Sequence, residues 1–212
     1  MRPITLSRQL TAADDNGIAL AQQLLAAGNL VLTGAAFVAN GIAQLDAQRK
    51  IGIASTGDLS LITFTVYGTN QPGNVISESL AGPNNNTVST TLDFYTVTRV
   101  AASAAVSTDV IVGTTGVGAS QPLPLDIYLP FGNTTSVDVT GTVNYSVQVT
   151  NSDPFGDPST PLNWVAYPGG ALTAQTTDLT SSTVIAYRAM RLLTNSGTGI
   201  AAITITQQGL IV

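Results

Sequence analysis

From residue 29 onward, short stretches in which apolar and polar residues alternate are separated by residues that favour turns. The clearest early stretch covers residues 61–69, where Ile62, Phe64 and Val66 alternate with residues that tolerate water. A period of two places every second side chain on the same face of a β-strand, so that one face is buried and the other is solvated. Many such strands with short turns between them predict an all-β chain of antiparallel sandwiches or barrels.

Similar stretches predict strands through the rest of the chain. They cover residues 29–33, 42–54, 75–80, 87–100 and 106–112 in the first part, and 137–149, 184–193 and 200–207 in the second. In the strand at residues 42–54, the residues expected to face the core are Ile42, Ile51 and Ile53.

Turn-forming residues mark the connections between these strands. Asn40-Gly41 favours a tight hairpin turn, and Pro72-Gly73 favours a type II turn across residues 71–74. In the strand at residues 137–149 the odd-numbered residues are mostly valine and are expected to be buried, and Gly141 among them indicates a bend or bulge. A glycine-rich run at residues 194–199 predicts the loop of a hairpin.

A boundary between two β units is expected near residue 120. Residues 113–124 are rich in Gly and Pro and lack a strand pattern, which is typical of a linker. The predicted organisation is an N-terminal arm over residues 1–28, a first β-sandwich unit over 29–119 and a second over 120–212.

The first 28 residues have two interpretations. Thr11 with Asp14 resembles a capping box and Gly28 could end a helix over residues 12–27, whereas Asn16-Gly17 in its interior favours an extended arm. In either form the apolar residues lack a balancing charged face, so we expect them to contact a neighbouring subunit. These candidate interface residues are Ile4, Leu6, Leu10, Ile18, Leu20, Leu24 and Leu25.

Composition strengthens the expectation of an assembly. Only 9% of the 212 residues are charged, the mean hydropathy is +0.29 and the formal net charge is −5. An average soluble domain carries charges on roughly a quarter of its residues, and surface charge helps to keep a free protein soluble. A surface with so few charges fits burial against other proteins; a free-standing soluble β-sandwich is the alternative.

The residue inventory restricts the chemistry. With no His and no Cys, the chain has no Ser-His-Asp triad, cysteine nucleophile, disulfide or His-ligated zinc. Lys50 is the only lysine and Glu78 the only glutamate, and the seven basic residues form no stripe for a phosphate backbone. We therefore expect no enzyme, no catalytic or metal-binding residues, no cofactor, no nucleic-acid partner and no membrane association.

Two weaker signals in the second half have ordinary structural interpretations. Asp153 and Asp157 could bind calcium, but Asp-Pro turns explain both. Four aromatic residues could stack on a sugar, although core or interface positions are more usual for aromatics in a β-sandwich. These four are Tyr128, Phe131, Trp164 and Tyr167.

Six runs of the sequence carry a family likeness: ITFTVYGTN at residues 62–70, GNVISESLAGP at 73–83, VSTTLDFYTVT at 88–98, GTVNYSVQ at 141–148, RAMRL at 188–192 and SGTG at 196–199. They resemble strand sequences in structural proteins of tailed bacteriophages, podoviruses especially. The likeness covers residues 29–209 and carries no catalytic motif.

The resemblance implies a virion structural protein, assembled in the host cytoplasm. It looks most like a head decoration, or cement, protein that clamps neighbouring major capsid subunits, with the major capsid protein or other virion proteins as partners and a homo-oligomer in the assembly. A neck or tail component, or a fibre-associated module that binds a host glycan, is the alternative. An enzyme acting on cell-wall sugar is a third, which the residue inventory disfavours.

Overall fold

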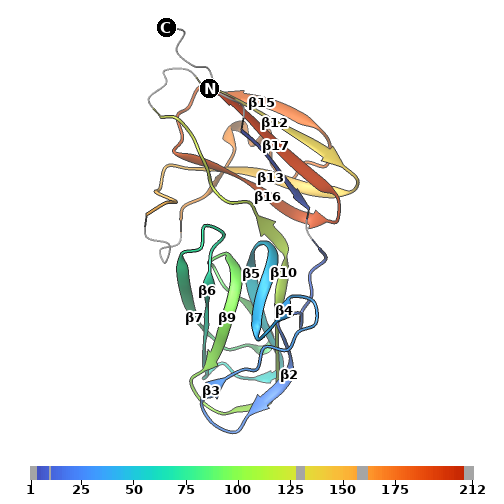
Figure 1. Ribbon diagram of the computed structural model, residues 1–212, viewed down its shortest axis with the longest axis vertical. Coiled ribbons are helices and arrows are strands. Elements are labelled where there is room, and N and C mark those ends of the chain that lie inside the picture. Colours follow the sequence, from blue (N-terminus) through green and yellow to red (C-terminus); the bar gives the residue numbers. More distant parts are fainter. Residues whose placement is uncertain (1–3, 10, 128–131, 157–161, 208–212) are drawn as a thin grey trace. The chain divides into compact units, whose positions relative to one another are not determined.

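The computed structural model describes residues 4–9, 11–127, 132–156 and 162–207 (Figure 1). These residues are mostly β-strand, and their one helical element is the three-residue 3-10 helix η1 (Pro168–Gly170). The sheets are antiparallel. The prediction of an all-β, sandwich-like class is confirmed.

The chain forms two compact units. We call Ala13–Gly118 the central unit, because it lies in the middle of the sequence. We call the other unit, which combines Met1–Ala12 with Ala119–Val212, the terminal unit. The division at Gly118 lies within the run at residues 113–124 where the sequence places a boundary, but the expected linker is wrong for residues 113–119, which continue β10 (Val106–Ala119). The first 28 residues do not form a separate segment, because they are shared between the two units.

The central unit contains nine strands around a core of aliphatic and aromatic side chains. They are β2 (Ala19–Leu24), β3 (Gly28–Asn29), β4 (Val38–Ala39), β5 (Ile42–Asp58), β6 (Thr63–Thr69), β7 (Val75–Ala81), β8 (Asn84–Ser89), β9 (Phe94–Ala102) and β10 (Val106–Ala119). Strands β10, β5, β9, β6 and β7 follow one another in the sheet, and β2, β3, β4 and β8 add to its members. Phe64 and Val66 of β6 are completely buried, as their alternation predicts.

The turn between β4 and β5 shows how local residues set a register. Asn40 and Gly41 both have positive φ, 55° and 76°, and join Ala39 to its partner Ile42. This geometry matches the tight hairpin turn predicted from Asn-Gly. Ile42 itself was expected in the core but is 46% exposed, because it begins β5 immediately beside the turn.

The extent of several strands differs from the expectation. Residues 87–100 form two strands, β8 and β9, rather than one, and residues 29–33 pair as a strand only at β3. The turn at residues 71–74 has the expected positive φ at Gly73, but its hydrogen bond joins Gly73 N to Asn70 O, one residue earlier than predicted.

Residues 12–27 are not helical. Gly17 N donates to Asp14 O in a turn, Ile18 N donates to Val112 O of β10, and β2 follows. A Cβ at Gly17 would lie 2.9 Å from the Phe37 ring, so only glycine fits beside that side chain. The segment is therefore extended, as the second interpretation expects, but it joins the sheet of the central unit instead of forming a separate arm.

The terminal unit has two sheets that share one core. Its strands are β1 (Ile4–Gln9), β11 (Leu123–Pro124), β12 (Asn133–Thr140), β13 (Val143–Thr150), β14 (Val165–Ala166), β15 (Leu179–Thr183), β16 (Ala189–Gly197) and β17 (Ile200–Gln207). One sheet has the order β1-β17-β12-β15; in the other, β13 lies between β14 and β16, and β11 pairs with β16. Val137, Tyr145, Val147, Leu192 and Ile203 from the two sheets belong to one buried cluster.

Residues 137–149 form two strands in different sheets rather than one strand. The prediction of a hairpin with its loop at residues 194–199 is also wrong, because the strands on its two sides lie in different sheets. β12 ends at Thr140 and β13 begins at Val143, while β16 and β17 change sheets beside them. The pairs Thr140↔Ile200 and Val143↔Gly197 flank this corner. Gly141, with φ of 81°, makes the bend that the sequence indicates. The odd-numbered side chains remain directed inward on both sides of the corner, since both sheets face the same core.

Replacing Gly197 by alanine is expected to lower the stability of the terminal unit by about 3 kcal/mol. Its φ of 92° alone costs a side chain about 1–2 kcal/mol. In addition, a Cβ at Gly197 would lie 2.4 Å from Thr142 O, so the corner must open. Gly170→Ala is the matched control, since Gly170 has positive φ with open space around it. Equal urea midpoints for the two variants would show that the corner is not tightly packed.

Candidate interaction surface

The described part of the chain shows no group of three or more His, Cys, Asp or Glu that could hold a metal. Glu78, the only glutamate, is engaged within its own unit. Its carboxylate accepts hydrogen bonds from Thr91 N and Oγ1 and from Leu92 N, at 2.8 to 3.0 Å. Glu78 therefore fastens the loop between β8 and β9 to β7. Lys50 is exposed on β5.

Arg49 is the largest completely buried side chain in the described structure. Its Nε and Nη2 donate to the two carboxylate oxygens of Asp46 at 2.8 and 2.6 Å, and Nη1 donates to Thr115 O at 3.2 Å. The guanidinium also lies 5.9 Å from the ring centroid of Phe37. A bidentate pair with a further carbonyl acceptor holds a buried guanidinium in one place. Arg49 thus organises the core of the central unit.

Within the described residues, three titratable groups have a pKa displaced away from neutrality. Burial, with lesser contributions from Asp178 and Asp138, raises the pKa of Tyr145, and burial raises that of Tyr167. Hydrogen bonds from Ser60 lower the pKa of Asp58. A general acid or base works best with a pKa near the working pH, so none of the three suits that role at neutral pH.

The candidate calcium loop is closed by donors from the chain itself. Asp153 Oδ1 accepts from Phe155 N at 3.0 Å, and Asp153 Oδ2 accepts from Arg188 Nη2 at 2.7 Å. This is the geometry of an Asx turn joined to an ion pair. Asp157, the second residue of this expectation, lies outside the described residues.

The aromatic residues considered for sugar stacking are not gathered in the described structure. Tyr167 is buried in the core of the terminal unit, while Trp164 is partly exposed. The guanidinium of Arg191 lies 4.5 Å from the Trp164 ring centroid and therefore covers one face of the indole. Tyr128 and Phe131 lie outside the described residues.

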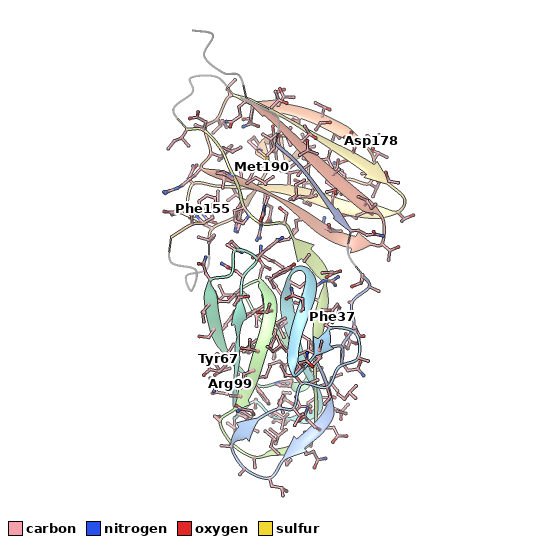
Figure 2. All side chains as sticks on the ribbon, viewed as in Figure 1. Phe37, Tyr67, Arg99, Phe155, Asp178 and Met190 are labelled. Carbon is pink, nitrogen blue, oxygen red and sulfur yellow. The ribbon has the colours of Figure 1, made fainter. Side chains whose placement is uncertain are left out.

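The arginines whose side chains are described are engaged with other groups. Arg49 and Arg188 form ion pairs, and Arg191 lies over Trp164. The Arg99 guanidinium stacks 3.8 Å from the Tyr67 ring centroid, and these two side chains lie beside each other in Figure 2. This scatter offers no continuous positive stripe in the described part of the chain.

The seven candidate interface residues near the N-terminus have different environments. Ile18 is completely buried in the core of the central unit and is unavailable to a neighbour. Leu6 and Leu24 are partly buried against the core of the terminal and central units respectively. Ile4 lies on β1 opposite Ile205, and Leu10 is outside the described residues. Leu20 and Leu25 are exposed, which a residue must be if it is to contact a partner. Two of the seven candidates therefore meet this condition.

Val31, which is not among the seven candidates, is a third exposed apolar side chain near β2 beside Leu20 and Leu25 in the sequence. We call these three residues the β2 patch; Leu25 is fully exposed and the others are about half exposed. Gln22 ties the backbone of Leu20 to that of Val31, because its side-chain amide donates to the carbonyls of both residues and accepts from Val31 N. A fixed backbone beneath exposed apolar side chains favours a specific protein contact.

A second exposed apolar group lies at one end of the four-stranded sheet in the terminal unit. Its members are Ile127, Val184 and Ile185, which we call the β15 patch; Val184 is 90% exposed. Asn133 of β12 pairs with Thr183 on one side and Gln207 on the other, and Gln207 Oε1 accepts from Asp126 N. Asp126 and Thr183 therefore both lie at this end of the sheet, and Ile127 and Val184 are the next residues in the chain.

Comparison of the chain with protein families, with curated proteins and with solved structures gives no match. The described residues include no helix long and apolar enough to cross a membrane. Three observations therefore bear on function. They are the two exposed apolar patches, the hydrogen bonds of Gln22 beneath one of them, and the small number of charged residues.

Proposed function

We propose that this chain is a non-enzymatic structural protein of a tailed-phage virion, and that it acts as a decoration protein clamping neighbouring major capsid subunits. The observation that carries the proposal is the exposure of large apolar side chains on both β units: Leu25 is fully exposed, Leu61 98% and Val184 90%. Such side chains, on a surface with few charges, favour burial against other proteins. The strand sequences that resemble podovirus structural proteins supply the kind of assembly.

The proposed mechanism is thermodynamic. Full burial of one exposed leucine or valine contributes about 1.5–3 kcal/mol, so two small patches support only modest affinity per contact once the cost of association is subtracted. Many copies on a repeating shell reinforce one another. Ser, Thr, Asn and Gln at the rim can hydrogen-bond across an interface without the larger desolvation cost of a buried charge.

The test compares particles with and without the protein. Particles that lack it are expected to assemble but to release DNA at lower temperature, because the clamp stabilises the assembled lattice. Attachment should change little between low and high salt, unlike a contact with a phosphate backbone. Stripped particles as heat-resistant as complete ones, or detachment by salt alone, would contradict the proposal. A copy number close to that of the capsid subunits supports decoration, whereas a few copies per particle support the neck or tail.

The patches can be tested directly. Leu25→Ser and Val184→Ser, alone and together, are expected to weaken attachment to particles at least tenfold while leaving the urea midpoint unchanged, since both side chains are already in water. Ser77→Ala, at an exposed position of β7, is the control and should attach like the wild type. Unchanged attachment of the double variant would show that other surfaces bind the shell.

A further inference from the structure

Strand β1 belongs to the terminal unit, although the whole central unit separates it in the sequence from the other strands of that unit. All six of its residues pair antiparallel with β17, from Ile4↔Ile205 to Gln9↔Ile200. In Figure 1 it is the dark blue strand next to the red β17. The other described strands of the terminal unit all come after the central unit in the sequence. The sheet of the terminal unit is thus completed by a strand that is attached to the central unit.

β1 lies at one edge of that sheet and also comes close to β16 of the other sheet. It is the first strand in the order β1-β17-β12-β15, and among the described strands it pairs only with β17. Besides the main-chain ladder, Thr5 Oγ1 lies 3.1 Å from Thr204 Oγ1, Gln9 Nε2 donates to Thr198 O, and Leu6 packs partly buried on the core. Every one of these contacts could be made equally well by the same strand from another copy.

The connection behind β1 is short and firmly anchored. Four residues, 10–13, separate Gln9 from Asp14. Asp14 N donates to Thr114 Oγ1 and its carbonyl accepts from Thr114 N at 2.9 Å. A Cβ at Gly113 would lie 2.0 Å from Asp14 O, so this close approach requires glycine. A short connection between an edge strand and a rigid anchor is the kind of hinge at which proteins exchange elements between copies.

We propose that β1 pairs with β17 of a second copy of this chain when copies are concentrated, so that each copy gives its β1 to a neighbour. The inference rests on the proposed assembly role and names one of its contacts. The exchanged and unexchanged forms contain the same hydrogen bonds and the same packing of Leu6. Their balance is therefore set by the hinge and by the local concentration of copies, which an ordered shell makes high.

The chain has no cysteine, so a disulfide can report which copy supplies β1. We would prepare Thr5→Cys/Thr204→Cys, whose hydroxyls touch across the two strands, and oxidise it both as concentrated purified protein and on particles. The matched control is Thr134→Cys/Ser182→Cys, an exposed cross-strand pair in the same sheet with Oγ1 and Oγ 3.2 Å apart. Non-reducing electrophoresis separates disulfides within a chain from disulfides between chains.

The expected result is covalent dimers or larger species from the β1–β17 variant, and monomers alone from the control. The two single-cysteine variants, oxidised separately, correct for random collisions. If the β1–β17 variant gives only monomers with an internal disulfide in both samples, strand exchange is overturned, while attachment to particles would still support the proposed function. If covalent dimers form but the protein does not attach to particles, exchange is supported and the decoration role is not.

Discussion

Replacing Arg49 by alanine is expected to destabilise the central unit by about 3–5 kcal/mol, the range for removing one partner of a buried ion pair. The substitution removes the two hydrogen bonds, at 2.6 and 2.8 Å, from the guanidinium to the Asp46 carboxylate, which is 21% exposed and keeps the backbone N–H of Ala47 as a donor. It also removes the donor to Thr115 O and leaves a cavity where a completely buried side chain lay. Since a small domain is stable by only about 5–15 kcal/mol, much of the central unit should unfold in mild urea.

The measurement can separate the two units because the single tryptophan, Trp164, lies in the terminal unit. Far-ultraviolet circular dichroism should show an early transition in Arg49→Ala, while tryptophan fluorescence keeps its wild-type midpoint. Lys50→Ala, at the exposed neighbouring position, should change stability by less than about 0.5 kcal/mol.

A double variant tests whether the lost stability comes from the unpaired charge. Arg49→Met/Asp46→Leu removes both charges and fills part of the space, a replacement that is often neutral or stabilising for buried ion pairs. We expect it to recover most of the stability lost in Arg49→Ala. A double variant as unstable as the single one would mean that packing around the guanidinium, rather than its charge, is what the core requires.

Local alternation was sufficient to predict the strand class and the buried faces of individual strands. Phe64 and Val66 are buried, and Asn40-Gly41 forms its turn, because these features depend on residues within a few positions of one another. Strand partners depend on residues far apart in the sequence. At Thr140 the chain leaves one sheet for another; Gly141 marks a bend there, but no local pattern shows that the strands on its two sides belong to different sheets.

The candidate site was predictable only in part for a similar reason. Apolar character marks Ile18 and Leu25 alike, yet Ile18 lies in its own core and Leu25 in solvent. Whether an apolar residue is covered by its own unit or is left for a partner depends on the tertiary fold. Val31 lies in the stretch at residues 29–33 that predicts a strand, but its exposure and its hydrogen bonds with Gln22 appear only in the folded structure. Likewise, the burial of Arg49 follows from Asp46 three residues earlier, a spacing with no meaning in a regular strand.

The substitution with the largest expected effect is Val143→Asp, which should unfold the terminal unit. Val143 is 1% exposed in the first position of β13, opposite Gly197 at the corner, and its side chain belongs to the core shared by the two sheets. An aspartate there must either bury an unpaired charge or be protonated at a large cost, about 5 kcal/mol or more, which approaches the whole stability of a small domain. Thr142→Asp is the control, because it adds the same charge one residue away on an exposed side chain.

Trp164 fluorescence in urea measures this unit alone, since the tryptophan lies outside the central unit. Thr142→Asp should unfold with a midpoint close to that of the wild type, whereas Val143→Asp should give the unfolded signal before urea is added. The comparison also tests the register of β13. A slip of one residue would exchange the two faces of the strand, placing residue 142 inside and residue 143 outside, and the two variants would then exchange their behaviour. Wild-type stability of Val143→Asp would therefore contradict the sheet corner and the shared core together, because both require the odd-numbered side chains of β12 and β13 to point inward.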